Sequence, residues 1–211
     1  MCGRYIRKIL QEDIIKHFDL VDGRDYFDIH GYQMSAEVFP GEDILVINSD
    51  REFEDRFWTV IEKDNQGNLR RVINAKAENV LNADMFRDHF KTGRCLVPAS
   101  GFYEWDASKQ RYEFTFDDEI IAFGGIARPS DIKGETRNCS VVITVPANDV
   151  VRPIHPKDRM PLIVRKHDYE RWLDPATPLN EVRQMMRPWP SSETHAQNAA
   201  EPQEKTQGSL F

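Results

Sequence analysis

Short apolar segments, separated by polar and turn-forming residues, recur along this chain and constrain its fold more than any other feature. Several of them are spaced as in β-hairpins, whereas helical spacing of apolar residues is rarer. The pattern predicts an α+β protein with mainly antiparallel, twisted mixed sheets, an open barrel-like core and flanking helices, rather than a strictly alternating parallel fold. The expected strands cover residues 44–47, 57–61, 94–97, 112–116, 120–126, 140–145 and 162–164. Helices are expected at 10–18, 80–90 and 169–173.

The length and the distribution of polar residues predict one folded domain with a tail. A chain of 211 residues with 40% hydrophobic content can bury a substantial core. After Met186 the sequence turns polar and rich in proline and serine. We therefore expect a folded domain over residues 1–187 and a disordered tail over 188–211.

Charge and cysteine usage exclude several classes of protein. The formal net charge of -7 argues against a broadly basic coat for nucleic acid, although it allows a local positive groove. The three cysteines contain no CxxC pair and the six histidines show no ligand spacing with them, so neither a disulfide framework, nor a metal site, nor a cofactor is expected. Cys95 and Cys139 lie in apolar segments and are expected to be small buried hydrophobes. Without an apolar span or a signal sequence, we expect a cytoplasmic protein with no membrane partner.

A cysteine follows the initiating methionine, in the sequence Met-Cys-Gly-Arg-Tyr. Removal of Met1 would leave Cys2 with an amine and a thiol on adjacent carbons. The α-amine has a pKa of about 7.7–8.0, so about a tenth of it is unprotonated at neutral pH. Such a pair can condense with an aldehyde through nitrogen and close a ring through sulfur, or the thiol can serve as a hydrolytic nucleophile.

Three internal segments combine polar side chains with short apolar runs. Residues 72–78 read Val-Ile-Asn-Ala-Lys-Ala-Glu, and residues 94–105 read Arg-Cys-Leu-Val-Pro-Ala-Ser-Gly-Phe-Tyr-Glu-Trp. The third segment has Pro-Ala-Asn at 146–148 and Ile-His-Pro-Lys-Asp-Arg-Met-Pro at 154–161. In a strand over 101–105, a period of two would place Phe and Glu on one face and Tyr and Trp on the other.

Together with the N-terminus, these segments resemble the SOS response-associated peptidase family, also described as abasic-site processing proteins that crosslink to DNA. The resemblance runs from Cys2 to about Trp172, with separate motifs in the family's order. It implies covalent capture of the aldehyde of abasic sites in single-stranded DNA as a thiazolidine, with lyase and autoproteolytic activities at the same site. A nucleoid-associated location when engaged on DNA follows from that role.

The resemblance also implies roles for individual residues. Cys2 corresponds to the nucleophile, Asn74 to a residue that orients its amine, Glu104 to a proton shuttle and His155 to a second acid or base. From the residues alone, each of the last three has a plainer interpretation as a turn asparagine, a surface carboxylate or a turn histidine. The expected DNA contacts are the cations and the aromatic nearest to these motifs: Arg4, Lys76, Trp105 and Arg159.

The sequence departs from the family pattern in four places. Lys76 stands where arginine is usual. A planar guanidinium that can donate two parallel hydrogen bonds is thus replaced by a compact ammonium group. A loop normally written Asn-Val-Ala-Pro reads Glu-Val-Phe-Pro at 37–40, and Thr-Val-Ile-Glu-Lys at 59–63 replaces a glycine- and tryptophan-containing segment. His155 is separated from Arg159 by two more residues than usual. We expect the reaction at Cys2 to be preserved and the contacts with DNA to differ from those of the family.

Two other functions fit parts of the sequence. A glutamine amidotransferase of the N-terminal nucleophile type also begins Met-Cys-Gly, but it normally continues with isoleucine rather than Arg4, and no glutamine pocket is recognisable. A non-catalytic module that binds single-stranded DNA would need only the cations and aromatics.

The last residues form a separate candidate motif. Residues 207–211 read Gln-Gly-Ser-Leu-Phe at the end of a polar segment. This ending resembles the short peptide by which bacterial repair proteins dock on the DNA sliding clamp, with Gln207 anchoring one end and Leu210 and Phe211 filling an apolar pocket. A random tail end is the alternative interpretation.

Overall fold

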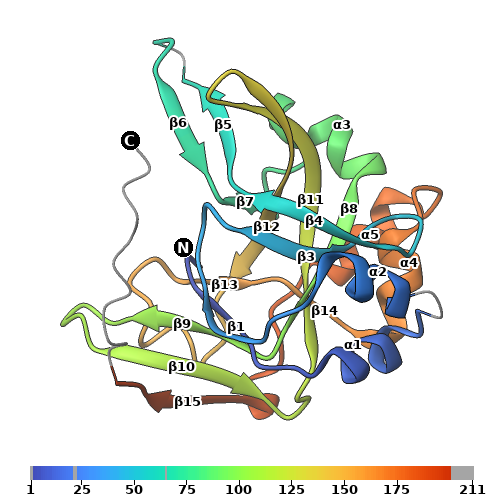
Figure 1. The fold of residues 1–211 in the computed structure, drawn as a ribbon. Coiled ribbons are helices and arrows are strands. Elements are labelled where there is room, and N and C mark those ends of the chain that lie inside the picture. The colour runs from blue at the N-terminus through green and yellow to red at the C-terminus, as the bar shows by residue number, and fades with distance from the viewer. Residues whose placement is uncertain (1, 21–22, 65, 201–211) are drawn as a thin grey trace.

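Five strands close into a barrel in this computed structural model, which describes residues 2–20, 23–64 and 66–200 (Figure 1). Around the ring the order is β12-β4-β3-β8-β11, and β11 pairs with β12 to close it. The pairs are antiparallel except for β12 with β4. The barrel strands are β3 (Asp43–Ile47), β4 (Phe53–Trp58), β8 (Arg94–Ala99), β11 (Ile121–Ile132) and β12 (Glu135–Pro146).

The α+β class and the barrel-like core are confirmed, but the ring is closed rather than open. Closure depends on β12, which has 12 residues and therefore pairs along its length with different neighbours. Its first part pairs with β11 and with Phe57 and Trp58 of β4, while its second part pairs with two short strands. These are β7 (Asn74–Lys76), which runs parallel to β12, and β13 (Arg159–Pro161). Another short strand, β14 (Ile163–Val164), pairs with β11.

A second, five-stranded antiparallel sheet packs against the barrel in the order β15-β10-β9-β1-β2. Tyr5 of β1 is buried, and its ring contacts Trp58 and Phe123 of the barrel edge-on, at centroid distances of 5.4 and 5.8 Å. The strands of this outer sheet are β1 (Tyr5–Arg7), β2 (Ser35–Val38), β9 (Gly101–Trp105), β10 (Arg111–Phe116) and β15 (Thr194–Asn198).

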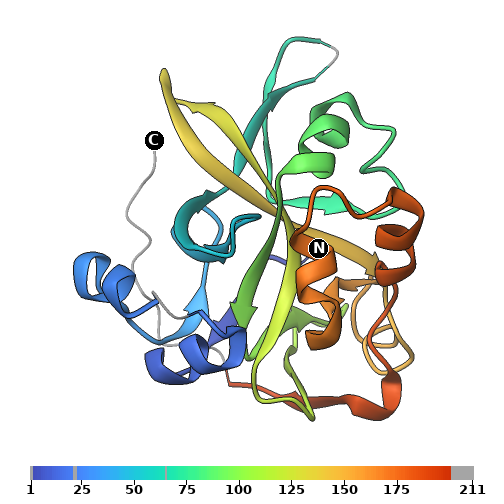
Figure 2. The ribbon, with the colours of Figure 1, turned by 90° about the vertical axis from the view of Figure 1, so that its right-hand side faces the viewer.

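Helices flank the barrel, and the three expected from apolar spacing are confirmed. The described helices are α1 (Gln11–Phe18), α2 (Gly23–His30), α3 (Asp84–Thr92), α4 (Tyr169–Leu173) and α5 (Leu179–Met185), with short 3₁₀ turns η1 (Lys166–Asp168) and η2 (Ser191–Glu193). Phe18 of α1 stacks on Tyr169 of α4, and the Trp172 indole of α4 donates to the Cys95 carbonyl of β8 at 3.0 Å. These contacts fix α1 and α4 on one side of the barrel (Figure 2).

Two hairpins project from the same end of the barrel in both views (Figures 1 and 2). One is formed by β5 (Val60–Lys63) and β6 (Leu69–Val72), and the other by the outer ends of β11 and β12. The expected strand 57–61 is therefore two strands. They separate at Thr59, whose amide donates to the Phe57 carbonyl at 2.8 Å in a tight turn. The Ser130 hydroxyl of β11 ties the hairpins together through both backbone groups of Ile61.

The expectation of a disordered tail from residue 188 is wrong for the residues up to 200. Trp189 is buried and packs edge-on against Phe116, and β15 pairs with β10 over five residues. All but the first residue of β15 are exposed. Hydrogen bonds at a sheet edge, rather than apolar burial, hold this polar segment, so its composition gave no sign of a strand. Residues 201–211 lie outside the described residues.

No helix in the described part of the chain is long and apolar enough to cross a bilayer.

Candidate active site

Four polar residues from distant parts of the sequence lie where the outer sheet meets the barrel. Cys2 precedes β1, and Glu104 lies on the neighbouring strand β9 of the same sheet. Asn74 begins β7, which is attached to β12, and His155 lies in the loop between β12 and β13. All four are buried, with at most 9% of each residue exposed. We call these four residues the Cys2 site.

Asn74 holds the backbone of Cys2. Its side-chain Nδ2 donates to the Cys2 carbonyl at 2.8 Å, across 72 positions of sequence. Its Oδ1 is buried and accepts no hydrogen bond from a described residue. Asn74 thus contacts the carbonyl of Cys2, while Oδ1 is the atom that remains to accept an N–H from the amine.

Glu104 is a buried carboxyl group poised between its two protonation states. Glycine at 101 lets β9 approach β10 closely, since a Cβ there would lie 2.5 Å from the Phe114 carbonyl oxygen. Phe102 stacks on Phe114 inside the molecule, and the strand period places Glu104 on that same inner face. Burial raises the pKa of Glu104 to about 7, against the opposing charge of Lys157. Near neutral pH it can both accept and donate a proton.

His155 lies beside Glu104, with Nδ1 at 3.4 Å from Oε2. Burial, together with the charge of Lys157, lowers the pKa of His155 to about 4. At pH 7 the imidazole is therefore neutral, and its contact with Glu104 is not an ion pair. Because Glu104 has the higher pKa of the two, a shared proton stays on the carboxyl group, and the neutral imidazole can accept a hydrogen bond from it.

The thiol of Cys2 is kept protonated. Burial, and then the charge of Glu104, raise the pKa of this thiol well above its usual range. The thiol donates weakly to the Arg4 carbonyl at an S···O distance of 3.8 Å. A buried neutral thiol is a poor hydrolytic nucleophile by itself, but it can add to a strong electrophile once a neighbouring base takes its proton.

Asn148 positions the loop that carries His155, a role that the sequence analysis did not predict. Its Oδ1 accepts from the amides of Val150 and Val151 at 3.1 and 3.0 Å. Its Nδ2 donates to the Trp189 carbonyl at 2.9 Å and to the Thr194 hydroxyl at 2.8 Å. An asparagine directly after a strand, with its side chain bonded two and three residues ahead, is a recognisable turn signal.

We expect Asn148→Ala to destabilise the fold by roughly 2–4 kcal/mol, because it leaves several buried polar groups without partners. Chemical denaturation of the whole protein measures this change. Asn138→Ala is the matched control, since Asn138 is an exposed residue of β12. A loss below about 1 kcal/mol, the size of one ordinary hydrogen bond, would contradict the positioning role.

The expected DNA contacts Arg4 and Trp105 lie together next to the Cys2 site. The Arg4 guanidinium lies 4.4 Å from the ring centre of Phe39 and 5.1 Å from that of Trp105. Both rings are partly exposed. Stacked aromatic and guanidinium groups are a surface on which bases can stack.

The carboxylate of Glu37 interacts with two arginines, Arg4 and Arg111, and the sequence did not reveal these pairings. This carboxylate lies 3.8 Å from the Arg4 guanidinium and forms an ion pair with Arg111. Arg111 is buried, and its guanidinium covers the Tyr103 ring at 3.6 Å. Tyr103 and Trp105 thus share the face of β9 opposite Glu104, as the strand period predicts.

Lys76 and Arg159 differ in what they can offer a phosphate. Lys76 ends β7 and is exposed. Arg159 is buried, and its guanidinium forms a bidentate ion pair with Glu78 at 2.8 and 2.9 Å and donates to the Thr144 carbonyl. In this structure Arg159 joins β13 to β12 and to the segment after β7, so a phosphate would have to displace Glu78 to reach it.

The remaining candidates do not add to the site. Cys95 and Cys139 are free and buried, as expected. No group of histidine, cysteine, aspartate and glutamate suited to a metal ion occurs among the described residues. The clamp-motif residues Gln207, Leu210 and Phe211 lie outside the described part of the chain.

Solved structures share this fold. A protein from Bacteroides thetaiotaomicron superposes with a TM-score of 0.78 at 22% identity, covering 94% of this chain and 92% of that one. A protein from Bordetella bronchiseptica gives a TM-score of 0.77 at 21% identity, covering 95% of this chain and 100% of that one.

Sequence relatives carry names that describe a function. The abasic site processing protein YoaM of Bacillus subtilis (strain 168) is 30% identical over 210 residues, which cover 93% of this chain and 89% of YoaM. The abasic site processing protein YedK of Escherichia coli (strain K12) is 24% identical over 184 residues, covering 82% of this chain and 79% of YedK. The family model described as SOS response associated peptidase (SRAP) matches residues 1–201. This chain belongs to the SRAP family.

Proposed function

We propose that this protein captures abasic sites in single-stranded DNA by forming a covalent bond through Cys2. The observation that carries this proposal is the Cys2 site itself, in which Asn74, Glu104 and His155 surround a cysteine that can expose both an amine and a thiol. The names of the relatives support the same substrate. Arg4 and Trp105 supply an adjacent surface for the strand.

The reaction begins after Met1 is released, because the peptide bond to Met1 otherwise occupies the nitrogen of Cys2. The free amine adds to the aldehyde of the ring-opened sugar, and Asn74 Oδ1 orients this amine through an N–H. The adduct loses water to give an imine, and Glu104 in its acid form protonates the departing oxygen. In this scheme the same site releases Met1 autocatalytically.

Ring closure makes the bond durable. The Cys2 sulfur adds to the imine carbon, its proton passes through Glu104 or the neutral His155, and the nitrogen regains a proton. The product is a thiazolidine, and the overall reaction releases one water. Reaction through a nearby thiol gains from high effective concentration. If the ring does not close, the imine can instead undergo an elimination that breaks the DNA strand at the abasic site. Lyase activity is therefore a side reaction of the same intermediate.

One gel separates this function from its two rivals. The protein is mixed with a single-stranded oligonucleotide that contains one abasic site, and the products are denatured and separated by size. Covalent capture gives a shifted band that survives denaturant. An amidotransferase would instead release ammonia from glutamine, and a non-catalytic binding module would give neither product.

The C-terminal motif yields a separate prediction that rests on the sequence alone. We expect a peptide carrying residues 207–211 to bind a purified bacterial sliding clamp with micromolar affinity, equivalent to about -8 kcal/mol. A tether of this kind would raise the concentration of the Cys2 site at replicating DNA. The measurement is a peptide titration, with Leu210→Ala and Phe211→Ala together as the control that should abolish binding. No binding at ~100 µM, about a hundred-fold above that scale, would contradict the prediction.

A further inference from the structure

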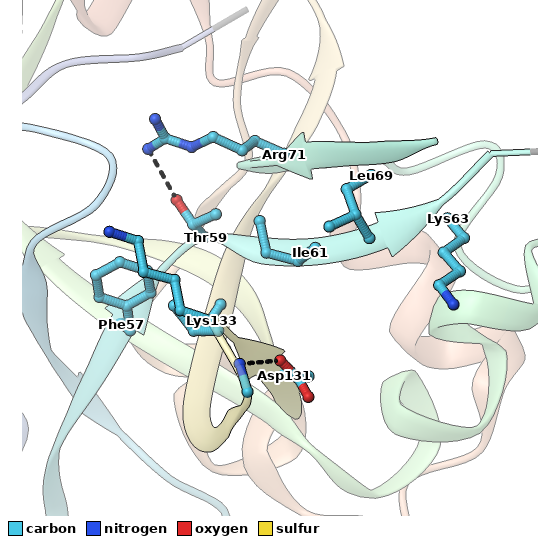
Figure 3. A pocket seen from close by; sticks show the side chains of 10 residues that line it. Phe57, Thr59, Ile61, Lys63, Leu69, Arg71, Asp131 and Lys133 are labelled. Atoms are coloured by element: carbon cyan, nitrogen blue, oxygen red, sulfur yellow. Dashed lines mark hydrogen bonds between the residues drawn. The ribbon is translucent and has the colours of Figure 1, made fainter. Parts of the chain in front are cut away.

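A groove of about 640 Å³ lies between the two projecting hairpins (Figure 3). Its walls come from the end of β4, from β5 and β6, and from the turn that joins β11 to β12. We call it the hairpin groove. The segment at 59–63 that departs from the family pattern forms part of its wall.

The walls of the hairpin groove are mainly apolar. Phe57, Ile61, Leu69 and Ile132 line it, and Leu69 is 69% exposed. An exposed leucine on a projecting hairpin gains nothing from the fold of the protein alone, whereas it would lose water on contact with a ligand. The Arg137 guanidinium lies over the Phe57 ring, 4.2 Å from its centre.

The charged side chains of the groove are mostly cationic. Arg71, Lys63 and Lys133 line it, and all three are exposed. In Figure 3 the Arg71 and Lys133 side chains extend toward one end of the groove, and Lys63 lies at the other end. Among the described residues that line the groove, Asp131 alone carries a carboxylate, and this carboxylate accepts a hydrogen bond from the Gly134 amide at 2.8 Å within the turn. On a protein of net charge -7, this excess of positive charge is local.

A chain of contacts connects the hairpin groove with Arg4, two residues after Cys2. Arg71 precedes Asn74 by three residues along one extended segment, a separation of about 10 Å. The Arg71 guanidinium also donates to the Pro40 carbonyl and to the Thr59 hydroxyl, each at 3.5 Å. Pro40 follows Phe39, whose ring lies under the Arg4 guanidinium. A path of alternating cations and apolar surface therefore leads from Arg4 to the hairpins.

We propose that the hairpin groove binds the single strand of DNA on one side of the abasic nucleotide. This inference rests on the proposed function and specifies its substrate further. Phosphates contact Arg71, Lys133 and Lys63 in turn, while the bases lie against the apolar wall that includes Leu69. Such contacts are independent of base sequence. The positive charge favours a polyanion over an extended protein segment as the occupant.

The test uses a fluorescent single-stranded oligonucleotide that carries a tetrahydrofuran analogue of the abasic site, which has no aldehyde and reports noncovalent binding alone. Lys63→Ala and Lys133→Ala are combined in one variant, and Leu69→Ala forms a second. We expect both to bind more weakly. Loss of two phosphate contacts in the double variant should make the slope of log K against log salt shallower by about 1.4.

The matched control combines Lys16→Ala and Lys166→Ala, which remove the same charge from exposed positions on α1 and η1, away from the hairpins. This control should keep the parent's slope. Oligonucleotides extended on only one side of the analogue localise the effect, and the defect should appear for one of the two extensions only.

Two results would overturn the inference: a slope and affinity in the Lys63/Lys133 variant that match those of the control, or an equal defect for both extensions. A match to the control would indicate that the groove binds a protein segment rather than DNA. Crosslinking of a true abasic strand at subsaturating concentration should fall in both groove variants in proportion to the lost affinity. If the parent protein does not crosslink at all, the proposed function is wrong. The noncovalent titration with the tetrahydrofuran analogue would still show whether the groove binds DNA.

Discussion

Cys2→Ala is expected to abolish the heat-stable adduct with abasic single-stranded DNA. Alanine retains the α-amine, so it can still form the imine, but it has no sulfur to close the ring. The noncovalent affinity should be largely kept, because Arg4, Lys76 and the hairpin groove are untouched. The measurement compares the denaturing gel shift with trapping by borohydride, which reduces an imine to a stable amine.

The matched control is Cys139→Ala, which removes a thiol that is buried in β12. This variant should crosslink like the parent. A heat-stable adduct formed by Cys2→Ala without borohydride would show that the durable bond does not involve the sulfur of Cys2, and the thiazolidine mechanism would be wrong.

Glu104→Gln is expected to slow crosslinking by roughly 10²–10⁴-fold, the range typical of a lost general acid or base. Glutamine preserves the shape of the side chain and its neighbourhood but cannot exchange a proton at neutral pH. Noncovalent DNA affinity should change little, because Glu104 is only 5% exposed and lies on the inner face of β9. Single-turnover rates with excess protein measure the effect directly.

The pH dependence gives this prediction a second signature. The protonated fraction of Glu104 declines above its pKa of about 7. The unprotonated fraction of the Cys2 α-amine increases with pH and approaches its maximum above the amine pKa of about 7.7–8.0. If dehydration limits the rate, the parent should speed up toward pH 7, stay nearly level between the two pKa values and slow down above them. Glu104→Gln should instead rise with the amine and then level off. Identical profiles and rates for the two proteins between pH 5 and about 8 would remove Glu104 from the mechanism.

Retention of Met1 could imitate the same loss of rate, so the intact mass of each variant is measured first. If Glu104→Gln retains Met1, the residue acts in processing. The crosslinking rate is then measured on protein whose Met1 has been removed by an aminopeptidase. A slow rate in the trimmed variant isolates the proton transfer from the processing step.

The sequence predicted the local elements with strong periodicity and missed those without it. Helices α1, α3 and α4 follow the spacing of their apolar residues, with Phe18, Phe86 and Trp172 on the buried side. Helix α2 buries only Gly23 and Phe27, and the β5–β6 hairpin is largely exposed, so neither gave a clear pattern. Strand β15 is polar and stabilised mainly by its hydrogen bonds to β10.

Closure of the barrel was beyond reach of local patterns. It requires β12 to pair in parallel with β4, more than 80 positions earlier, where Cys139 lies opposite Phe57. Such pairing is set by the long-range packing of strands rather than by their own composition. The sequence shows the run of apolar residues in β12, but it does not show how many strands pair with β12.

The same distinction applies to the site. Cys2, Asn74, Glu104 and His155 were expected from motif order, and the structure brings them together. The sequence did not predict that Glu37 would pair with Arg4 and Arg111, or that Arg159 would be held by Glu78. Ion-pair partners depend on three-dimensional proximity, and a charged residue in a sequence does not reveal whether its charge is available to a ligand.

Counting thiols in the crosslinked protein tests the central claim most directly. The chain has three cysteines, all free, and each should react with an alkylating reagent in denaturant. Covalent capture as a thiazolidine predicts an adduct with the mass of the protein without Met1 plus the oligonucleotide minus one water, and it predicts that only Cys95 and Cys139 are alkylated. Alkylation of Cys2 within the adduct, or an adduct that retains Met1, would contradict the account.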